Sequence, residues 1–134
     1  MTRKVVLLIV VVLIVTATKA RAHHSFAAVF DANKPVSVKG VITEIRLENP
    51  HSWFYIDVKD ENGKVAKWSF EGIAPTSLIR GGYKKDAVKV GDVVTIKGSH
   101  AQDPAVNVGA AREIVLEDGR SFIVGPKGNE ASGY

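Results

Sequence analysis

The residues of this sequence best suited to chemistry are four histidines, because the chain contains no cysteine. They are His23, His24, His51 and His100, and none of them lies in an apolar run. A histidine at a free chain terminus chelates copper(II) through its α-amine and its Nδ1 atom, and a second imidazole completes a T-shaped site. Nitrogen donors of this kind suit copper(II), which leads the divalent affinity series. The four histidines are therefore candidate metal ligands, provided that His23 becomes the N-terminus.

Residues 1–22 have the pattern of a secretory signal peptide that would expose His23. Two basic residues precede an apolar run of 13 residues (5–17), and Ala20-Arg21-Ala22 fits the small-x-small site of signal peptidase. The apolar run is shorter than the roughly 20 residues that a spanning helix needs. We expect a periplasmic or secreted protein without a permanent membrane anchor. An uncleaved anchor and cleavage after Ala20 are the alternatives.

The other histidines leave two interpretations open. His24, at the second mature position, offers copper a local chelate of the amine, one amide nitrogen and its imidazole, which needs no fold. His51 in a loop and His100 just past the fourth expected strand converge if their loops lie on the same side of the domain. The alternative is that His51 caps the Asn-Pro turn and that His100 is a solvated loop residue.

A pair of aromatic residues is the second candidate site. In the alternating segment 53–59, Trp53 and Tyr55 lie on the face opposite Phe54 and Ile56. Exposed rings on neighbouring strands form a stacking platform for sugars or bases. We expect a small envelope ligand there, beside basic side chains at positions 59 and 67. The alternative is that the N-terminal arm or a helix covers the two rings as a second small core.

The charge of the mature chain argues against a nucleic-acid partner. The precursor has a formal net charge of +4, but the leader contains four basic residues and no acidic residue. The mature chain therefore has 14 basic and 14 acidic residues, and it lacks the cationic surface that phosphate-backbone binding requires. No motif of a hydrolase or a phosphate-binding loop is present. We expect a binding protein and not an enzyme, with a copper redox enzyme as a third alternative.

The elements that position these residues predict an all-β fold. The order is three strands, a short helix over 74–85 and two strands, which is typical of a small five-stranded OB-like Greek-key barrel with one short helix between strands 3 and 4. A parity switch at Gly40 predicts a bulge in the first strand. A small open β-sandwich is the competing fold. The expected segments are an N-terminal arm (23–34), the barrel (35–124, with strands at 35–47, 53–59, 65–71, 93–98 and 112–117 and a final extension at 121–124) and a flexible tail (125–134).

Four short phrases carry a resemblance to a known family. They are His23-His24-Ser25-Phe26, Asn49-Pro50-His51-Ser52-Trp53, Lys89-Val90-Gly91-Asp92 and Leu116-Glu117-Asp118-Gly119-Arg120. Together the phrases resemble a family of small exported bacterial proteins known only as a domain of unknown function. The resemblance covers nearly the whole mature chain and implies no particular activity.

A looser likeness concerns Glu71-Gly72-Ile73-Ala74-Pro75, which is similar to a segment of the OB-fold haem chaperone of cytochrome c maturation. That family attaches haem through a histidine near its C-terminus. No histidine follows His100 in this chain, so we expect no haem. The oligomeric state does not follow from the sequence.

The first prediction concerns processing. The exported protein should begin at His23, because signal peptidase reads Ala20-Arg21-Ala22. Intact mass and N-terminal sequencing of native material will check this. A protein that begins at Met1 or Arg21 would contradict it and would remove the terminal chelate.

Overall fold

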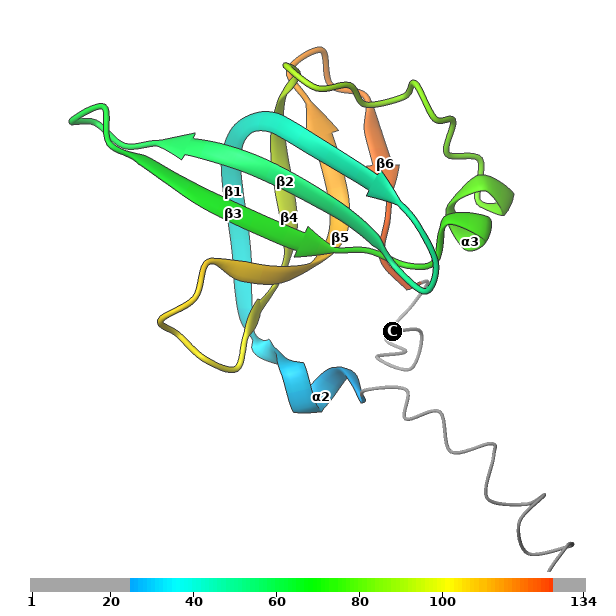
Figure 1. The fold of residues 1–134 in the computed structure, drawn as a ribbon, viewed down its shortest axis with the longest axis horizontal. Coiled ribbons are helices and arrows are strands. Elements are labelled where there is room, and N and C mark those ends of the chain that lie inside the picture. Colours follow the sequence, from blue (N-terminus) through cyan, green and yellow to red (C-terminus); the bar gives the residue numbers. More distant parts are fainter. Residues whose placement is uncertain (1–24, 127–134) are drawn as a thin grey trace, which may run out of the picture.

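The computed structural model describes residues 25–126. The expected signal peptide (1–22), His23, His24 and the end of the expected tail (127–134) lie outside the described residues. The described chain is all-β, with six strands in one sheet and two short helices (Figure 1). The elements are α2 (Phe26–Val29), β1 (Phe30–Leu47), β2 (Ser52–Lys59), β3 (Val65–Glu71), α3 (Pro75–Arg80), β4 (Val93–Ala101), β5 (Val108–Leu116) and β6 (Ser121–Ile123).

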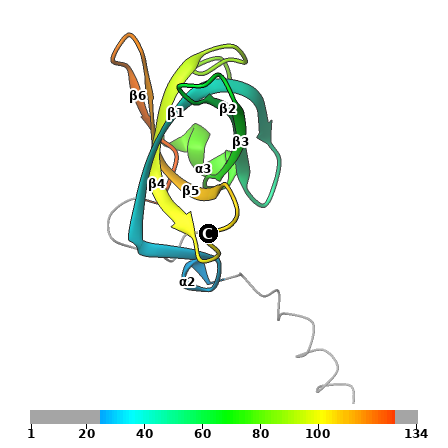
Figure 2. The same cartoon turned by 90° about the vertical axis from the view of Figure 1, so that its left-hand side faces the viewer.

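The strands follow the order β3-β2-β1-β4-β5-β6, and all neighbours in this order are antiparallel. In addition, β3 pairs with β5 in parallel, so Phe70 lies opposite Gly109 and Glu71 opposite Ala110. Each of β1 to β5 therefore has a partner on both of its edges. Figure 2 shows these strands curving around a common interior, in which α3 is visible at the far side.

The bulge in β1 lies two to three residues beyond the position expected at Gly40. Pairing of β1 with β2 is regular through Ile42 and shifts register between Ile42 and Glu44, so Thr43 is the extra residue. Val41 is 40% exposed, whereas Ile42 is buried. Val41 therefore lies before the bulge on the outer side of β1 and does not share the inward face with Ile45. After the bulge, Ile45 and Leu47 pack against the core.

Gly40 is required for a different reason: the backbone of β2 passes too close to it for any side chain to fit. A Cβ atom at this position would lie 2.6 Å from the carbonyl oxygen of Asp57 on β2. Gly98 on β4 is tighter still, because a Cβ atom there would lie 1.8 Å from the carbonyl oxygen of Ala110 on β5. Both glycines thus permit the close approach of a neighbouring backbone, as glycine inside a strand often does.

The main core follows from the alternation of the central strands. Phe54 and Ile56 of β2 face inward together with Phe70 of β3 and Ile96 of β4, and all four are fully buried. Leu78 of α3 packs against the same cluster. The other buried members are Ile42, Tyr83, Val88, Val94, Ala111, Ile114, Leu116 and Val124.

Several boundaries differ from the expected ones. The expected number of five strands is wrong, because residues 121–123 form β6, paired antiparallel with β5 from Glu113 to Val115. The expected arm (23–34) ends earlier, because β1 begins at Phe30, which lies opposite Ala101 of β4. Gly125 does not belong to a flexible tail as expected, since it is buried and donates a backbone hydrogen bond to the carbonyl oxygen of Arg112. These additions depend on pairing between distant segments.

The expected helix over 74–85 is shorter in the structure. α3 has Pro75 in its first turn, where the missing N–H costs nothing. It ends at Gly81, and Gly82 follows with a φ of +94°. The short helix therefore lies between β3 and β4, as expected.

Tyr83 follows α3 and carries a buried hydroxyl. Its ring packs edge-on against Phe54 and Phe122, and its side chain is 5% exposed. The hydroxyl has no hydrogen-bond partner among the described residues. Burial raises the pKa of Tyr83 to about 12.

This environment predicts an alkaline loss of stability that Tyr83→Phe removes. An unfolded tyrosine releases its proton near pH 10, whereas the folded one keeps it until about pH 12. The free energy contributed by the neutral hydroxyl is thus present below pH 10 and is lost as the pH rises toward 12. Urea unfolding at pH 7 and pH 11 should show a smaller alkaline decrease for Tyr83→Phe than for wild type. At pH 7 the variant should lie within about 1 kcal/mol of wild type or above it. Equal alkaline decreases in both proteins would contradict the prediction.

Candidate functional site

The outer face of β1, β2 and β3 carries the predicted aromatic pair. Trp53 and Tyr55 point away from the buried Phe54 and Ile56, as expected from the alternation of β2. Their rings are near-parallel, with centroids 6.4 Å apart and an interplanar angle of 25°. Both side chains are half-buried. The rings of Trp53 and Tyr55 together form an apolar surface along β2, called here the aromatic strip.

Arg46 extends this strip, and the sequence analysis missed it. Its guanidinium carbon lies 5.1 Å from the centroid of the Tyr55 ring, in a cation–π contact. An ion pair with Glu44 holds the guanidinium, and this hydrogen bond raises the pKa of Arg46 above its ordinary value. The β1–β2 register places Arg46 opposite Trp53 and Glu44 opposite Tyr55. That register depends on the bulge at Thr43, so no local pattern indicates it.

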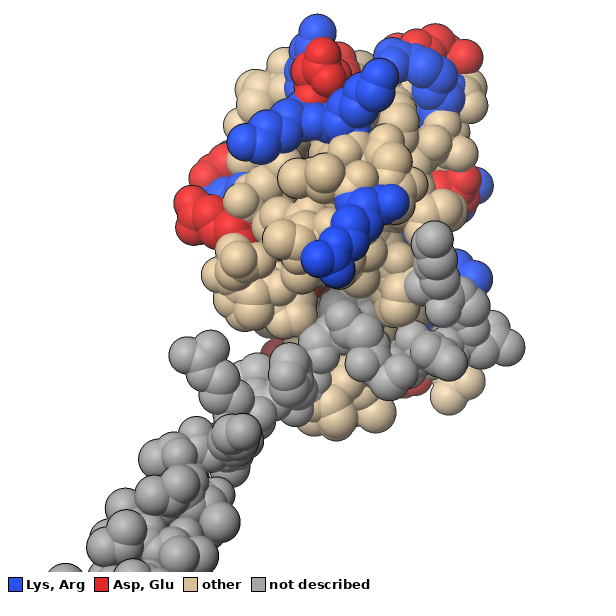
Figure 3. Space-filling model, turned by 90° about the vertical axis from the view of Figure 1, so that its right-hand side faces the viewer, with Lys and Arg blue, Asp and Glu red and all other residues tan. Residues whose placement is uncertain are grey.

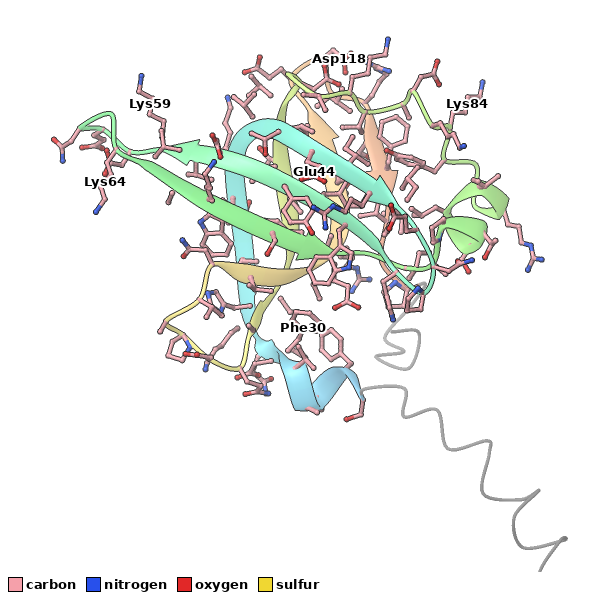
Figure 4. The ribbon with its side chains drawn as sticks, viewed as in Figure 1. Phe30, Glu44, Lys59, Lys64, Lys84 and Asp118 are labelled. Atoms are coloured by element: carbon pink, nitrogen blue, oxygen red, sulfur yellow. The ribbon has the colours of Figure 1, made fainter. Side chains whose placement is uncertain are left out.

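Polar groups from β3 border the other side of the strip. Ser69 lies opposite Tyr55 and Glu71 opposite Trp53. Lys67 pairs with Asp57 at 3.2 Å. Lys59 is not a neighbour of the rings, because it lies near the far tip of the β2–β3 hairpin, close to Lys64 (Figure 4). The strip therefore has a mixed rim of donors and acceptors.

His51 lies in the loop between β1 and β2, next to this rim. Its Nδ1 atom is 2.9 Å from Oε1 of Glu71, and the two side chains are 21% and 14% exposed. The neighbouring Ser52 is fully buried, and its hydroxyl donates a hydrogen bond to the carbonyl of Ile73. The loop is thus held against the end of β3 by contacts of His51 and of Ser52.

His100 lies within β4 and not beyond it, which corrects the expected position. β4 extends to Ala101, because its last residues pair with both β1 and β5. The imidazole ring packs edge-on against Trp68, with centroids 5.5 Å apart. Its Nδ1 atom is 2.9 Å from the carbonyl oxygen of Ala101. Trp68 itself stacks on Phe70 and packs against the main core.

The two histidines of the described residues, His51 and His100, do not lie in one cluster. His51 contacts Glu71, which shares the outer face with Trp53, whereas His100 contacts Trp68, which faces inward with Phe70. Within residues 25–126, no three side chains of the metal-binding types lie close enough together to hold an ion. The predicted ligands His23 and His24 lie outside the described residues.

The N-terminal arm forms a second small cluster on the outside of the sheet. Phe26 of α2 packs against Phe30, with ring centroids 5.5 Å apart. Ala101, Ala110 and Val108 complete this cluster. Trp53 and Tyr55 belong to neither cluster of the described residues. The N-terminal arm thus forms a second small core, as the alternative interpretation expected. This core lies beside the aromatic strip and does not cover Trp53 and Tyr55.

Charges of both signs are interspersed on the surface. Figure 3 shows one face, on which basic side chains gather along the upper edge with acidic side chains beside them, above a mostly uncharged surface.

The comparisons identify the family of the chain. The structure defines a small all-β protein with an aromatic strip on one outer face and a histidine–glutamate pair beside it. The chain belongs to a family of unknown function, DUF6152, whose sequence model matches residues 10–109. The expected membership of a family of unknown function is thereby confirmed. No curated protein matches the chain. In the part of the chain that is described, no helix has the length and apolar character to cross a membrane.

Proposed function

We propose that the chain is an exported, OB-like binding module, located in the periplasm or secreted. Three features support the OB-like assignment: a bulged first strand, a helix between β3 and β4, and the parallel pairing of β3 with β5. In OB barrels the outer face of strands 2 and 3 and the adjoining loops bind oligosaccharides or oligonucleotides. The signal-peptide pattern of residues 1–22 supports export.

The aromatic strip is the proposed binding surface, and a carbohydrate is the proposed ligand. The stacking of Trp53 on Tyr55, with Arg46 over Tyr55, carries this proposal. Flat rings offer an apolar surface to the ring face of a sugar, and Arg46, Glu44, Ser69 and Glu71 offer hydrogen bonds to its hydroxyls. The balanced charge of the mature chain favours a sugar over a polyanion.

The test is a titration with soluble peptidoglycan fragments and with chitotetraose. The fluorescence of Trp53 should change when a ligand binds. It can be measured by itself in the variant Trp68→Phe, in which Trp53 is the only tryptophan. Trp53→Ala should weaken binding tenfold or more, because stacking on one aromatic ring contributes about 1–3 kcal/mol. Fluorescence titration and calorimetry will measure the change.

Ile79→Ala is the matched control, since Ile79 is 53% exposed on α3, away from the strip. It should bind both probes as wild type does. Trp53→Ala should also cost less unfolding free energy than Trp68→Ala, because Trp68 packs on the core. Equal affinities of Trp53→Ala and wild type would refute the proposed surface.

Copper(II) binding by a mature N-terminal His23 is the second candidate function. It is supported by the cleavage pattern before His23 and by the anchoring of the chain three residues later, at Phe26. The α-amine has a pKa of roughly 7.7–8.0, so it loses its proton to copper at modest cost near neutral pH. We propose a binding role and no catalytic activity.

His23→Ala should abolish this mode, because it removes the imidazole that binds copper together with the α-amine of the same residue. For a ligand that binds only the folded state, a hundredfold excess over Kd stabilises by about 2.7 kcal/mol. Wild type should therefore show a copper-dependent rise in Tm that His23→Ala lacks. Identical copper titrations and melting curves for the two proteins would exclude the terminal site.

A further inference from the structure

We propose that the ligand of the aromatic strip runs across the strands, from β2 toward β5, and ends on Phe26 of the N-terminal arm. The surface then takes an extended oligosaccharide and not a single sugar. This inference rests on the proposed carbohydrate function and deepens it. It names the class of sugar ligand, gives its direction across the sheet, and assigns Phe26 as a second stacking position.

The register across four strands gives the surface its long dimension. Tyr55 of β2 lies opposite Ser69 of β3, and Ser69 lies opposite Val108 of β5. On its other side, Tyr55 lies opposite Glu44 of β1. Paired side chains point to the same side of a sheet and strands lie about 4.8 Å apart, so this row spans roughly 14 Å. A second row runs beside it, two residues along each strand, with Arg46, Trp53, Glu71 and Ala110 in the same strand order.

Along β2, in contrast, the aromatic surface is short. It comprises Trp53 and Tyr55, which are two residues apart and therefore span about 7 Å. In one direction the next outward residue is Asp57, which pairs with Lys67 at 3.2 Å. In the other direction the strand begins at Ser52. An extended ligand thus finds its longest continuous contact across the strands and not along them.

The N-terminal arm forms the far end of both rows. Ala110 is buried together with Phe30, and Phe26 and Val108 pack against this same cluster while remaining partly exposed. The Phe26 ring lies 5.5 Å from the ring of Phe30, at an angle of 39°. In Figure 4, Glu44 and Phe30 lie on opposite sides of β2 and β3. The surface therefore begins at β1 and ends at an aromatic ring beyond β5.

Gln102, in the loop between β4 and β5, holds the arm in this position. Its Nε2 atom donates hydrogen bonds to the carbonyl oxygens of Ala27 and Phe30, both at 3.1 Å. Its backbone N–H donates to the carbonyl oxygen of Val29 at 2.8 Å. Because the arm is held before a ligand arrives, stacking on Phe26 costs little additional ordering of the chain. Gln102 is therefore a positioning residue for the second stacking position.

The groups between the two aromatic ends match the chemistry of a neutral sugar chain. The Ser69 hydroxyl and the Glu71 carboxylate lie on β3, between the strip and the arm, and they offer hydrogen bonds to sugar hydroxyls. An anionic polymer would meet a carboxylate in each row, Glu44 in one and Glu71 in the other. The positive charge of Arg46 is already paired with Glu44. Neutral sugars with apolar ring faces and polar edges therefore fit this surface better than a polyanion does.

The test compares chitobiose with chitotetraose in calorimetric titrations of the mature protein. Wild type should bind the tetramer about tenfold or more tightly than the dimer, because only the tetramer reaches the second stacking ring. Phe26→Ala should remove this advantage and leave the dimer affinity unchanged. Gln102→Ala loosens the arm and should weaken binding of the tetramer alone. Val29→Ala is the matched control, since Val29 lies in the same helix α2, is 36% exposed and belongs to neither cluster. It should bind both sugars as wild type does.

Melting curves without sugar separate the loss of a contact from the loss of the fold. If Phe26→Ala is unfolded, Phe26→Leu takes its place, because it keeps an apolar side chain but removes the flat ring, and the same selective loss is expected. A tetramer affinity equal to wild type, or equal losses for both sugars, would overturn the inference. If wild type binds neither sugar, or Trp53→Ala binds both as wild type does, the proposed carbohydrate function itself fails. If Trp53→Ala weakens both sugars and the arm variants weaken neither, the aromatic strip stands and its extension onto the arm is refuted.

Discussion

The backbone pairing of β1 along both of its edges is the constraint on which the rest of the structure depends. Its earlier part pairs with β4, and its later part pairs with β2. Val41 has a partner on each side, Asp57 in β2 and Val93 in β4. β1 has 18 residues, and the extra residue Thr43 lies just after the position where its pairing passes from β4 to β2. A bulge at this position bends the strand and so directs its later part along β2.

The same bulge determines the chemistry of the outer face. Without the extra residue, every later side chain of β1 would point to the opposite side of the sheet. With it, Ile45 and Leu47 return to the core, and Glu44 and Arg46 lie beside Trp53 and Tyr55. The cation–π contact of Arg46 with Tyr55 is therefore a consequence of the backbone register.

The pairing of β3 with β5 has a comparable effect at the other end of the face. Gly109 permits it, because a Cβ atom there would lie 2.7 Å from the ring of Phe70. The pairing of β3 with β5 places Ala110 beside Glu71, and Ala110 is part of the surface on which Phe26 and Phe30 pack. The position of the N-terminal arm relative to Glu71 thus follows from one glycine contact.

The sequence predicted the elements whose signals are local. The hairpin of β2 and β3 has clear alternation on both sides of Asn62-Gly63, and Gly63 has the expected positive φ of 81°. The outward direction of Trp53 and the short helix after Pro75 followed from the same kind of local pattern. Features that depend on distant pairing were missed or misplaced. The glycine at position 40 indicated a bulge, whereas it serves close contact with Asp57, and the partners of His51 and Tyr55 required the register across three strands.

Glu71 connects the aromatic strip with the loop between β1 and β2. It lies opposite Trp53 across the β2–β3 pairing, and one of its carboxylate oxygens lies 2.9 Å from Nδ1 of His51. The Glu71 side chain is 14% exposed, so its charge is screened less than a charge on an open surface. The loop and the rim of the strip therefore share one partly buried carboxylate, and a change in the position of His51 would alter the electrostatic environment beside Trp53.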